Sequence, residues 1–192
     1  NGTGIRGGRF EGSNATASNI ALTGSVQYVK QNFTFQLSAY YGGSAGLTKR
    51  EADSLQLNSG MFGTPVGLGE VNVQYRKNGL TAKVLFAAIS IPEADKINRA
   101  YANNTAELSI GGYAEVAYRI LKRLRTDAFV RYENFNLNSS IPENGIENDI
   151  LKQQYVIAGF SCFPTAGVVV KLDYVYKQTG DLNPALNLNP CP

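Results

Sequence analysis

Histidine and tryptophan are missing from this chain of 192 residues, which also has only one Met and two Cys. Without His the chain offers no Ser-His triad, no His-ligated zinc and no His general base. The two cysteines, Cys162 and Cys191, form no CxxC or metal-ligand spacing, so we expect neither a metal nor a cofactor. The composition therefore predicts a protein that is not an enzyme.

Charge and long apolar runs are also scarce. Only 17% of the residues are charged, and the net charge of +3 comes from scattered Lys and Arg, which argues against nucleic-acid binding. The longest apolar run, 84–89, is far shorter than the about 20 residues of a transmembrane helix. What the chain does contain is 20 Gly, 11 Tyr and 9 Phe, a composition typical of an all-β protein with many turns.

Apolar and polar residues alternate along eight segments, as they do in strands with one apolar and one polar face. The predicted strands span 20–28, 33–41, 70–76, 82–89, 110–119, 128–133, 154–163 and 168–176. Residues 4–10 resemble the end of a further strand, and 154–163 is apolar on both faces, so its facing is undecided. Most runs reach about nine to eleven residues, which suits a tilted strand crossing a bilayer.

The predicted connections alternate between short and long. They are short at 29–32, 77–79, 120–125 and 164–166, and long at 42–69, 91–108, 136–153 and from 177 onward. Outer-membrane barrels alternate short periplasmic turns with long extracellular loops in this way. The sequence therefore predicts an antiparallel up-and-down transmembrane β-barrel. Within the long loops, 48–56 and 92–107 favour short helices that either fold into the pore or cover its rim.

Three motifs carry a resemblance to a known family. They are Phe129-Val130-Arg131-Tyr132-Glu133, Gly159-Phe160-Ser161-Cys162-Phe163-Pro164-Thr165 and Val168-Val169-Val170-Lys171-Leu172-Asp173-Tyr174. The chain resembles the porin-like outer-membrane proteins of Bacteroidetes bacteria and, more distantly, the phosphate-selective porins. The resemblance implies a signal peptide, a barrel of roughly sixteen strands and an aromatic-ended last strand. We therefore expect 1–192 to be a C-terminal portion of one barrel domain, without its final strand.

The polar parity of the strands predicts a pore wall. Its candidate side chains are Gln27, Gln36, Gln74, Lys83, Glu115, Arg119, Arg131, Glu133, Lys171 and Asp173. Charges of both signs on such a wall tune ion selectivity, and the slight excess of cations predicts a weak preference for anions. The alternative is that these charges merely pair across strands.

The leading functional prediction is a channel of the Gram-negative outer membrane that passes small hydrophilic or anionic solutes. The expected partners are outer-membrane lipid and lipopolysaccharide, the solutes, and either further copies of the protein or other envelope proteins, but no nucleic acid. One alternative is a structural barrel whose loops bind partners in an envelope complex. Another is a soluble secreted β-sandwich that binds glycans or acts as an adhesin. Cys162 and Cys191 are expected at opposite membrane faces, which argues against a disulfide between them.

Overall fold

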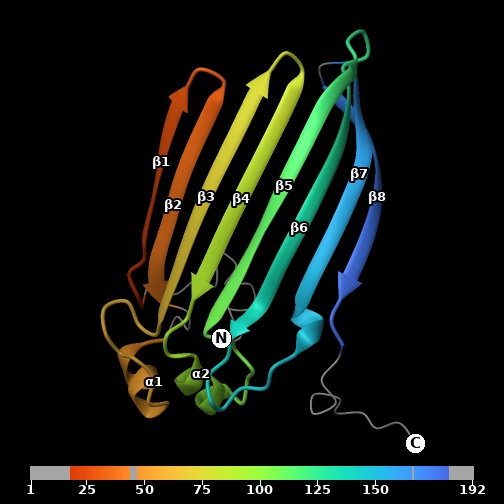
Figure 1. The fold of residues 1–192 in the computed structure, drawn as a ribbon. Helices are drawn as coiled ribbons and strands as arrows, with labels where there is room; N and C mark the ends of the chain where they lie inside the picture. The colour runs from red at the N-terminus through yellow and green to blue at the C-terminus, as the bar shows by residue number, and fades with distance from the viewer. Residues whose placement is uncertain (1–17, 44–46, 166, 182–192) are drawn as a thin grey trace, which may run out of the picture.

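Eight strands form one antiparallel sheet, and each strand pairs with the next one along the chain (Figure 1). The computed structural model describes residues 18–43, 47–165 and 167–181. The strands are β1 (Leu22–Lys30), β2 (Phe33–Gly43), β3 (Pro65–Lys77), β4 (Leu80–Ser90), β5 (Leu108–Leu121), β6 (Thr126–Ser140), β7 (Lys152–Thr165) and β8 (Val168–Thr179). The predicted all-β, up-and-down topology is confirmed. The sheet is not closed within the described residues, because β1 and β8 each have a single neighbour.

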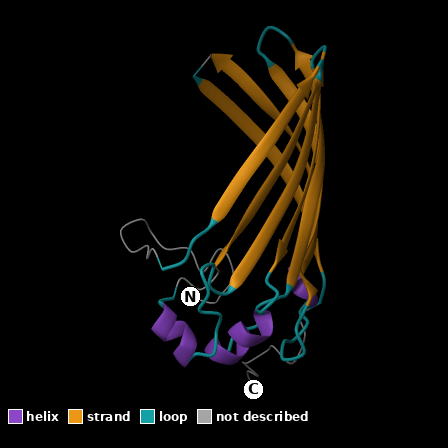
Figure 2. Cartoon of the chain, turned by 90° about the vertical axis from the view of Figure 1, so that its left-hand side faces the viewer, coloured by secondary structure: helices purple, strands orange, loops and turns teal. Residues whose placement is uncertain are grey.

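Short turns and long connections lie at opposite ends of the sheet (Figures 1 and 2). The turn between β3 and β4 is Asn78-Gly79, and both residues have positive φ angles, as a type I′ hairpin turn requires. The long connections carry the helices α1 (Lys49–Ser54) and α2 (Ala94–Tyr101) and the 3-10 helix η2 (Asp149–Leu151). Both predicted helices are therefore present but shorter than expected. None of the helices in the described part is long and apolar enough to cross a membrane.

Most strands extend a little beyond the predicted segments, and β3 and β6 extend the most. β6 continues to Ser140, and its pairing with β5 shifts register between Leu108 and Ile110. Such an irregularity breaks the period of two, so the strand signal is lost from the sequence. β3 already begins at Pro65, where Gly67 and Gly69 supply no apolar side chain to mark the strand. The long loops predicted at 42–69 and 136–153 are correspondingly shorter. The strand end expected at 4–10 lies outside the described residues.

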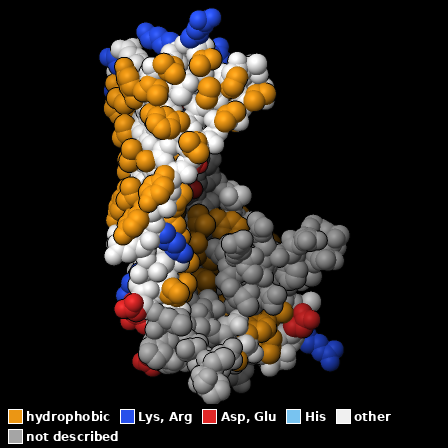
Figure 3. Space-filling model, turned by 90° about the vertical axis from the view of Figure 1, so that its right-hand side faces the viewer, with side chains coloured by type: hydrophobic (Ala, Val, Ile, Leu, Met, Phe, Trp, Pro, Cys, Tyr) orange, Lys and Arg blue, Asp and Glu red, His pale blue; other side chains and the backbone are white. Residues whose placement is uncertain are grey.

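The sheet exposes its apolar face, whereas an ordinary sheet of a soluble protein buries that face. Apolar residues of the central strands, such as Phe86, Val116 and Val130, are about half exposed on one face. Apolar side chains cover this face over most of its length (Figure 3). Pairing also settles the facing of β7, since Val156 lies opposite Tyr132 and Tyr176 of the apolar face. Alternate residues such as Tyr155 and Ile157 therefore lie on the polar face.

The buried hydrophobic cluster of the described residues lies among the long connections and not against the apolar face of the sheet. It consists of Ala52, Leu57, Val66, Ile91, Ala94 and Ile97. α1 and α2 thus pack together at the end of β3 and β4, and both are seen at this end of the molecule (Figure 2). The sheet is held mainly by its strand pairing, while the loops have a core of their own.

Candidate functional site

All ten side chains predicted for the pore wall lie on the polar face. Strand pairing places Gln27 opposite Gln36, Gln74 opposite Lys83, and Glu115 between Lys83 and Arg131. On β8, Lys171 is opposite Ser161 and Asp173 is opposite Gly159, which belong to the same face of β7. The register of eight strands therefore assembles residues separated by almost 150 positions on one surface.

Glu115 is the centre of a charge network that ties three strands together. Its Oε1 is 3.0 Å from Nζ of Lys83 on β4, and its Oε2 accepts a hydrogen bond of 2.8 Å from Nε of Arg131 on β6. Arg131 also donates to Glu133 at 3.1 Å. Glu115 is only 7% exposed, although it lies in the middle of an open sheet. The four charges cancel, so the middle of the polar face is charged but nearly neutral.

A second pair lies closer to the short turns. Nε and an Nη of Arg119 donate to the two carboxylate oxygens of Asp127 at 2.7 and 3.1 Å, a bidentate geometry that fixes both groups. Asp127 is not among the predicted pore-wall residues, although the parity of Arg131 and Glu133 extends back to it. Its partner depends on the β5–β6 register, which includes a shift between Arg119 and Leu121.

Several of these groups surround a hollow of about 640 Å³ on the polar face. Its charged lining residues are Arg76, Lys83, Arg119, Arg131 and Lys171, with Glu115, Asp127 and Asp173. Lys171 and Asp173 form no ion pair within the described residues. The hollow therefore carries more cations than carboxylates, and part of its charge is not neutralised by ion pairs.

Not every predicted residue contributes to this hollow. Gln27 and Gln36 lie on β1 and β2, apart from the strands that line it, and Gln36 donates to Ser38 at 3.2 Å. Gln74 and Glu133 share the face but are not among the residues that line the hollow. The site brought together by the structure is thus narrower than the set chosen by parity.

Aromatic rings also lie among the charges of the polar face, although none is among the predicted pore-wall residues. The rings of Phe135 and Tyr155 stack with centroids 5.7 Å apart, and the guanidinium of Arg131 lies 4.7 Å from the ring centre of Tyr113. Tyr113 has the same parity as Glu115, so the alternation of 110–119 already places it on the polar face. Tyr155 belongs to 154–163, which looks apolar on both parities, and Phe135 lies beyond the predicted strand 128–133. Only the strand pairing places these two rings on the face that carries the charges.

The long connections cover the end of the polar face. Tyr40 of β2 and Ile89 of β4 are on this face, opposite Leu68 of β3, and both pack against the buried loop cluster. In α2, Asn98 donates to the carbonyl of Thr105 at 3.0 Å and accepts from its backbone N–H at 2.6 Å. The loop is therefore tied down by buried hydrogen bonds as well as by apolar packing.

The described residues contain no group of three or more His, Cys, Asp or Glu that could hold a metal ion. Cys162 lies on β7 with its Sγ 3.6 Å from the carbonyl of Leu124. Cys191 lies outside the described residues, so the expectation that the two cysteines are not bonded stays a prediction.

Comparison with known proteins gives a weak sequence similarity. The chain is 24% identical over 187 residues to an uncharacterized protein of Aquifex aeolicus, an alignment that covers 90% of this chain and 40% of that protein. No known family model and no solved structure matches the chain. The chain spans less than half the length of this relative, and the resemblance to porin-like proteins stays a prediction.

Proposed function

We propose that this chain forms one wall of an outer-membrane β-barrel that acts as a porin for small hydrophilic solutes. The observation that carries the proposal is the reversed polarity of the sheet. In soluble proteins an antiparallel sheet packs its apolar face on a core and turns its polar face to water. Here the apolar face is exposed, with Leu172 at 73%, while Glu115 of the polar face is buried. Outer-membrane barrels turn apolar side chains to lipid and polar ones to the lumen.

The position of the apolar band supports a membrane barrel independently of its composition. Tyr28 and Tyr176 stand in the same rung of directly opposed residues, which runs across all eight strands. The apolar band is the set of apolar residues on the exposed face of the strands. On β1 this band ends at Tyr28, at its edge near the short turns, and the next residue on the same face is Lys30. On β8 it ends at Tyr176, at its edge near the long connections, and the next residue on the same face is Gln178. A single rung therefore crosses the band from one edge to the other.

This slope has the value expected for a barrel. The edge of the band moves six residues between Tyr41 on β2 and Tyr176 on β8, because Tyr176 shares a rung with Phe35. The band thus shifts by about one residue per strand. With a rise of about 3.3 Å per residue and a spacing of about 4.8 Å between strands, the band is parallel to the membrane plane when the strands tilt by about 35° from the membrane normal. Membrane barrels have strand tilts of about 35–45°.

The charges of the hollow support a weak preference for anions. Five of its lining residues are Lys or Arg and three are Asp or Glu. Most of these charges neutralise one another in the Glu115 and Asp127 pairs, so the remaining field is modest. A wide lumen with a small positive excess passes hydrophilic solutes with little selection beyond charge.

One alternative has a specific observation in its favour. The loops contain a buried core and cover the end of the polar face, as expected of a structural barrel whose ordered loops bind other envelope proteins. Conductance of the full-length protein in a planar bilayer separates the two functions. A porin gives stable, ohmic steps of current, whereas insertion into the bilayer without any conductance would leave the partner-binding barrel as the better proposal.

Membrane placement is tested by the same substitution on two adjacent residues of β5. Val116 is on the exposed apolar face, and Ala117 lines the polar hollow. In lipid, Val116→Arg should reduce the free energy of unfolding by about 2–4 kcal/mol near the middle of the bilayer, while Ala117→Arg should be tolerated. The measurement is urea unfolding of the full-length protein in lipid vesicles, followed by heat-modifiable gel mobility. Equal, small effects in a protein that stays in solution without detergent would refute the proposal.

A further inference from the structure

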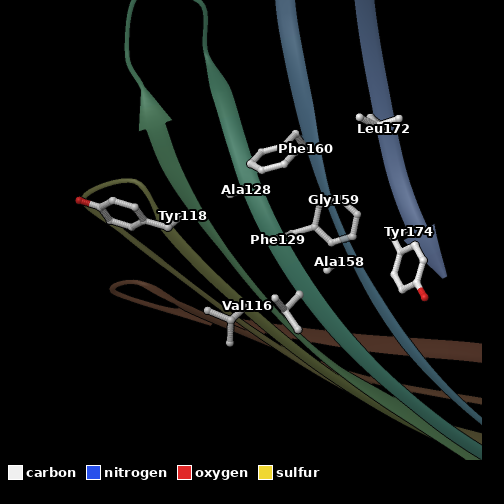
Figure 4. Close-up of a pocket in the computed structure, with 10 residues that line it drawn as sticks. Val116, Tyr118, Ala128, Phe129, Ala158, Gly159, Phe160, Leu172 and Tyr174 are labelled. Carbon is white, nitrogen blue, oxygen red and sulfur yellow. The ribbon is translucent and has the colours of Figure 1, made fainter. Parts of the chain in front are cut away.

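The apolar face contains a groove that the porin proposal does not use (Figure 4). It has a volume of about 480 Å³ and spans β5 to β8. Ala128 and Ala158 lie within it, and Tyr118 and Tyr174 stand on opposite sides of these two alanines (Figure 4). Nearly all of its lining is apolar, so a ligand must be a hydrocarbon or another apolar surface.

The direction of the groove fits a lipid chain. Ala128 is opposite Phe160, and Phe160 is two residues from Ala158, so the two alanines are one strand and two residues apart. This step is inclined to the strands by about 36°, given a rise of about 3.3 Å per residue and a spacing of about 4.8 Å. The line that joins the two alanines leans away from the strands in the same direction as the membrane normal does at the strand tilt of about 35° inferred above. The alanines thus follow the direction in which acyl chains lie.

The groove leads toward a basic turn. The connection between β5 and β6 contains Lys122, Arg123 and Arg125, all exposed and without an ion pair within the described residues. Leu121 and Leu124 alternate with these cations and are each half exposed. Lys and Arg gather at this end of the molecule (Figure 3), and the three turns between β1 and β6 contain no Asp or Glu.

We infer that this surface binds an anionic glycerophospholipid, with one acyl chain in the groove along Ala128 and Ala158 and the phosphate at Lys122, Arg123 and Arg125. The inference rests on the proposed membrane placement. Short turns of outer-membrane barrels face the periplasm, so the lipid belongs to the inner leaflet. Cations interleaved with leucines suit this interface, because their aliphatic stems remain in the apolar zone while the charges reach the phosphates.

The test uses the full-length protein in detergent, titrated with phosphatidylglycerol or with phosphatidylcholine of the same acyl chains, and native mass spectrometry to count retained lipids. Removing two charges with Lys122→Gln and Arg123→Gln should weaken retention of phosphatidylglycerol about tenfold or more and barely change that of phosphatidylcholine. The matched control, Lys30→Gln with Lys77→Gln, removes two charges at the short-turn ends of β1 and β3, away from the groove, and should have little effect.

The groove is tested by filling it. Ala128→Phe should weaken the retention of both lipids, while Ala82→Phe, on the apolar face of β4 outside the groove, should not. Equal loss in the charge variant and its control would show a general charge effect and overturn the inference, as would normal retention in Ala128→Phe. A change of oligomeric state in these variants, with lipid retention intact, would make the groove a subunit contact instead. Because insertion of the unsubstituted full-length protein into lipid vesicles is measured separately, inserted protein without selective lipid retention refutes this inference alone.

Discussion

At the scale of single residues, Glu115 is the side chain whose loss should affect both the stability of the sheet and the charge of its polar face. It is nearly buried and holds Lys83 and Arg131, so it both fixes the middle of the sheet and cancels charge on the polar face. A carboxylate in such a position stabilises the protein only through its partners, and its loss leaves two cations facing one another.

Glu115→Gln should therefore do two things. It should lower the free energy of unfolding by about 1–3 kcal/mol, because hydrogen bonds to a charged group are lost. It should also shift the reversal potential in a salt gradient toward anions, since the wall gains one net positive charge. The matched variant Glu133→Gln removes the same charge from a more exposed position with one partner, and should change selectivity with a smaller loss of stability. Unchanged selectivity in both variants of a conducting protein would show that this face does not line the conducting path.

The sequence predicted the face of each site residue but not its partner. Facing follows from the period of two, which is a local property of the chain, so Glu115 and Arg131 were correctly placed on one surface. Partners depend on register, which turn lengths and irregularities set, and the shift between Arg119 and Leu121 is invisible in the pattern. For the same reason the pairing of Asp127 with Arg119 and the stacking of Tyr155 on Phe135 were not anticipated.

At the scale of elements, α1 is defined by its first turn. The Thr48 side chain accepts from the backbone N–H of Glu51 at 3.4 Å, and the Glu51 carboxylate accepts from the backbone N–H of Thr48 at 2.9 Å, which together form a capping box. The Thr48 hydroxyl also donates to the Glu51 carboxylate at 2.7 Å, and this bond, together with the one from the Thr48 backbone N–H, holds the pKa of Glu51 below its usual range. α2 has no such side-chain cap at Glu93.

The cap should control access to the basic residues of α1. Thr48→Ala should cost the first turn about 1 kcal/mol, so trypsin should cut faster at Lys49 and Arg50. Cleavage at Arg99 of α2 should not change, because that helix is held by Ile97 and Asn98. Limited proteolysis with mass spectrometry measures both sites in one sample, and equal acceleration at all three would mean that the loops open as one unit.

The same cap implies a dependence on pH. Since the pKa of Glu51 is depressed in the folded loop, its contribution is complete above the unfolded pKa of about 4.3 and is lost as the pH falls through the folded value. Below about pH 4, α1 should therefore exchange its amide hydrogens faster relative to α2, after correction for intrinsic rates. A pH-independent ratio between the two helices would contradict the role of the carboxylate.

At the scale of the whole molecule, the sequence predicted the order of the strands and the facing of all of them except β7, because both depend on local patterns. It did not give the extent of β6, the packing of the loops or the slope of the apolar band. The slope is a property of the complete sheet: Tyr28 and Tyr176 are 148 positions apart in sequence, and only seven successive registers place them in one rung.

The slope gives a prediction about depth in the membrane. A rung of eight strands spaced by about 4.8 Å is about 34 Å long, so at a tilt of about 35° its ends should differ in depth by about 20 Å. Tyr28 should then lie at the periplasmic interface, Tyr176 at the opposite one, and Val84, in the same rung, near the middle. Because the chain contains no Trp, a single introduced Trp reports on its own surroundings.

The measurement is Trp fluorescence in vesicles whose lipids carry bromine at different depths along the acyl chain, for the variants Tyr28→Trp, Val84→Trp and Tyr176→Trp. Any other Trp of the full-length protein is removed beforehand. Quenching should be strongest with deep bromine for Val84→Trp and with shallow bromine for the other two. A water-soluble quencher confined to one side of the membrane should reach Tyr28→Trp and Tyr176→Trp from opposite sides. If all three positions are quenched equally by bromine at a single depth, the strands are not tilted and the sheet does not lie in the membrane as a barrel wall. If none is quenched by brominated lipid, the apolar face is covered by protein, and the membrane placement itself is wrong.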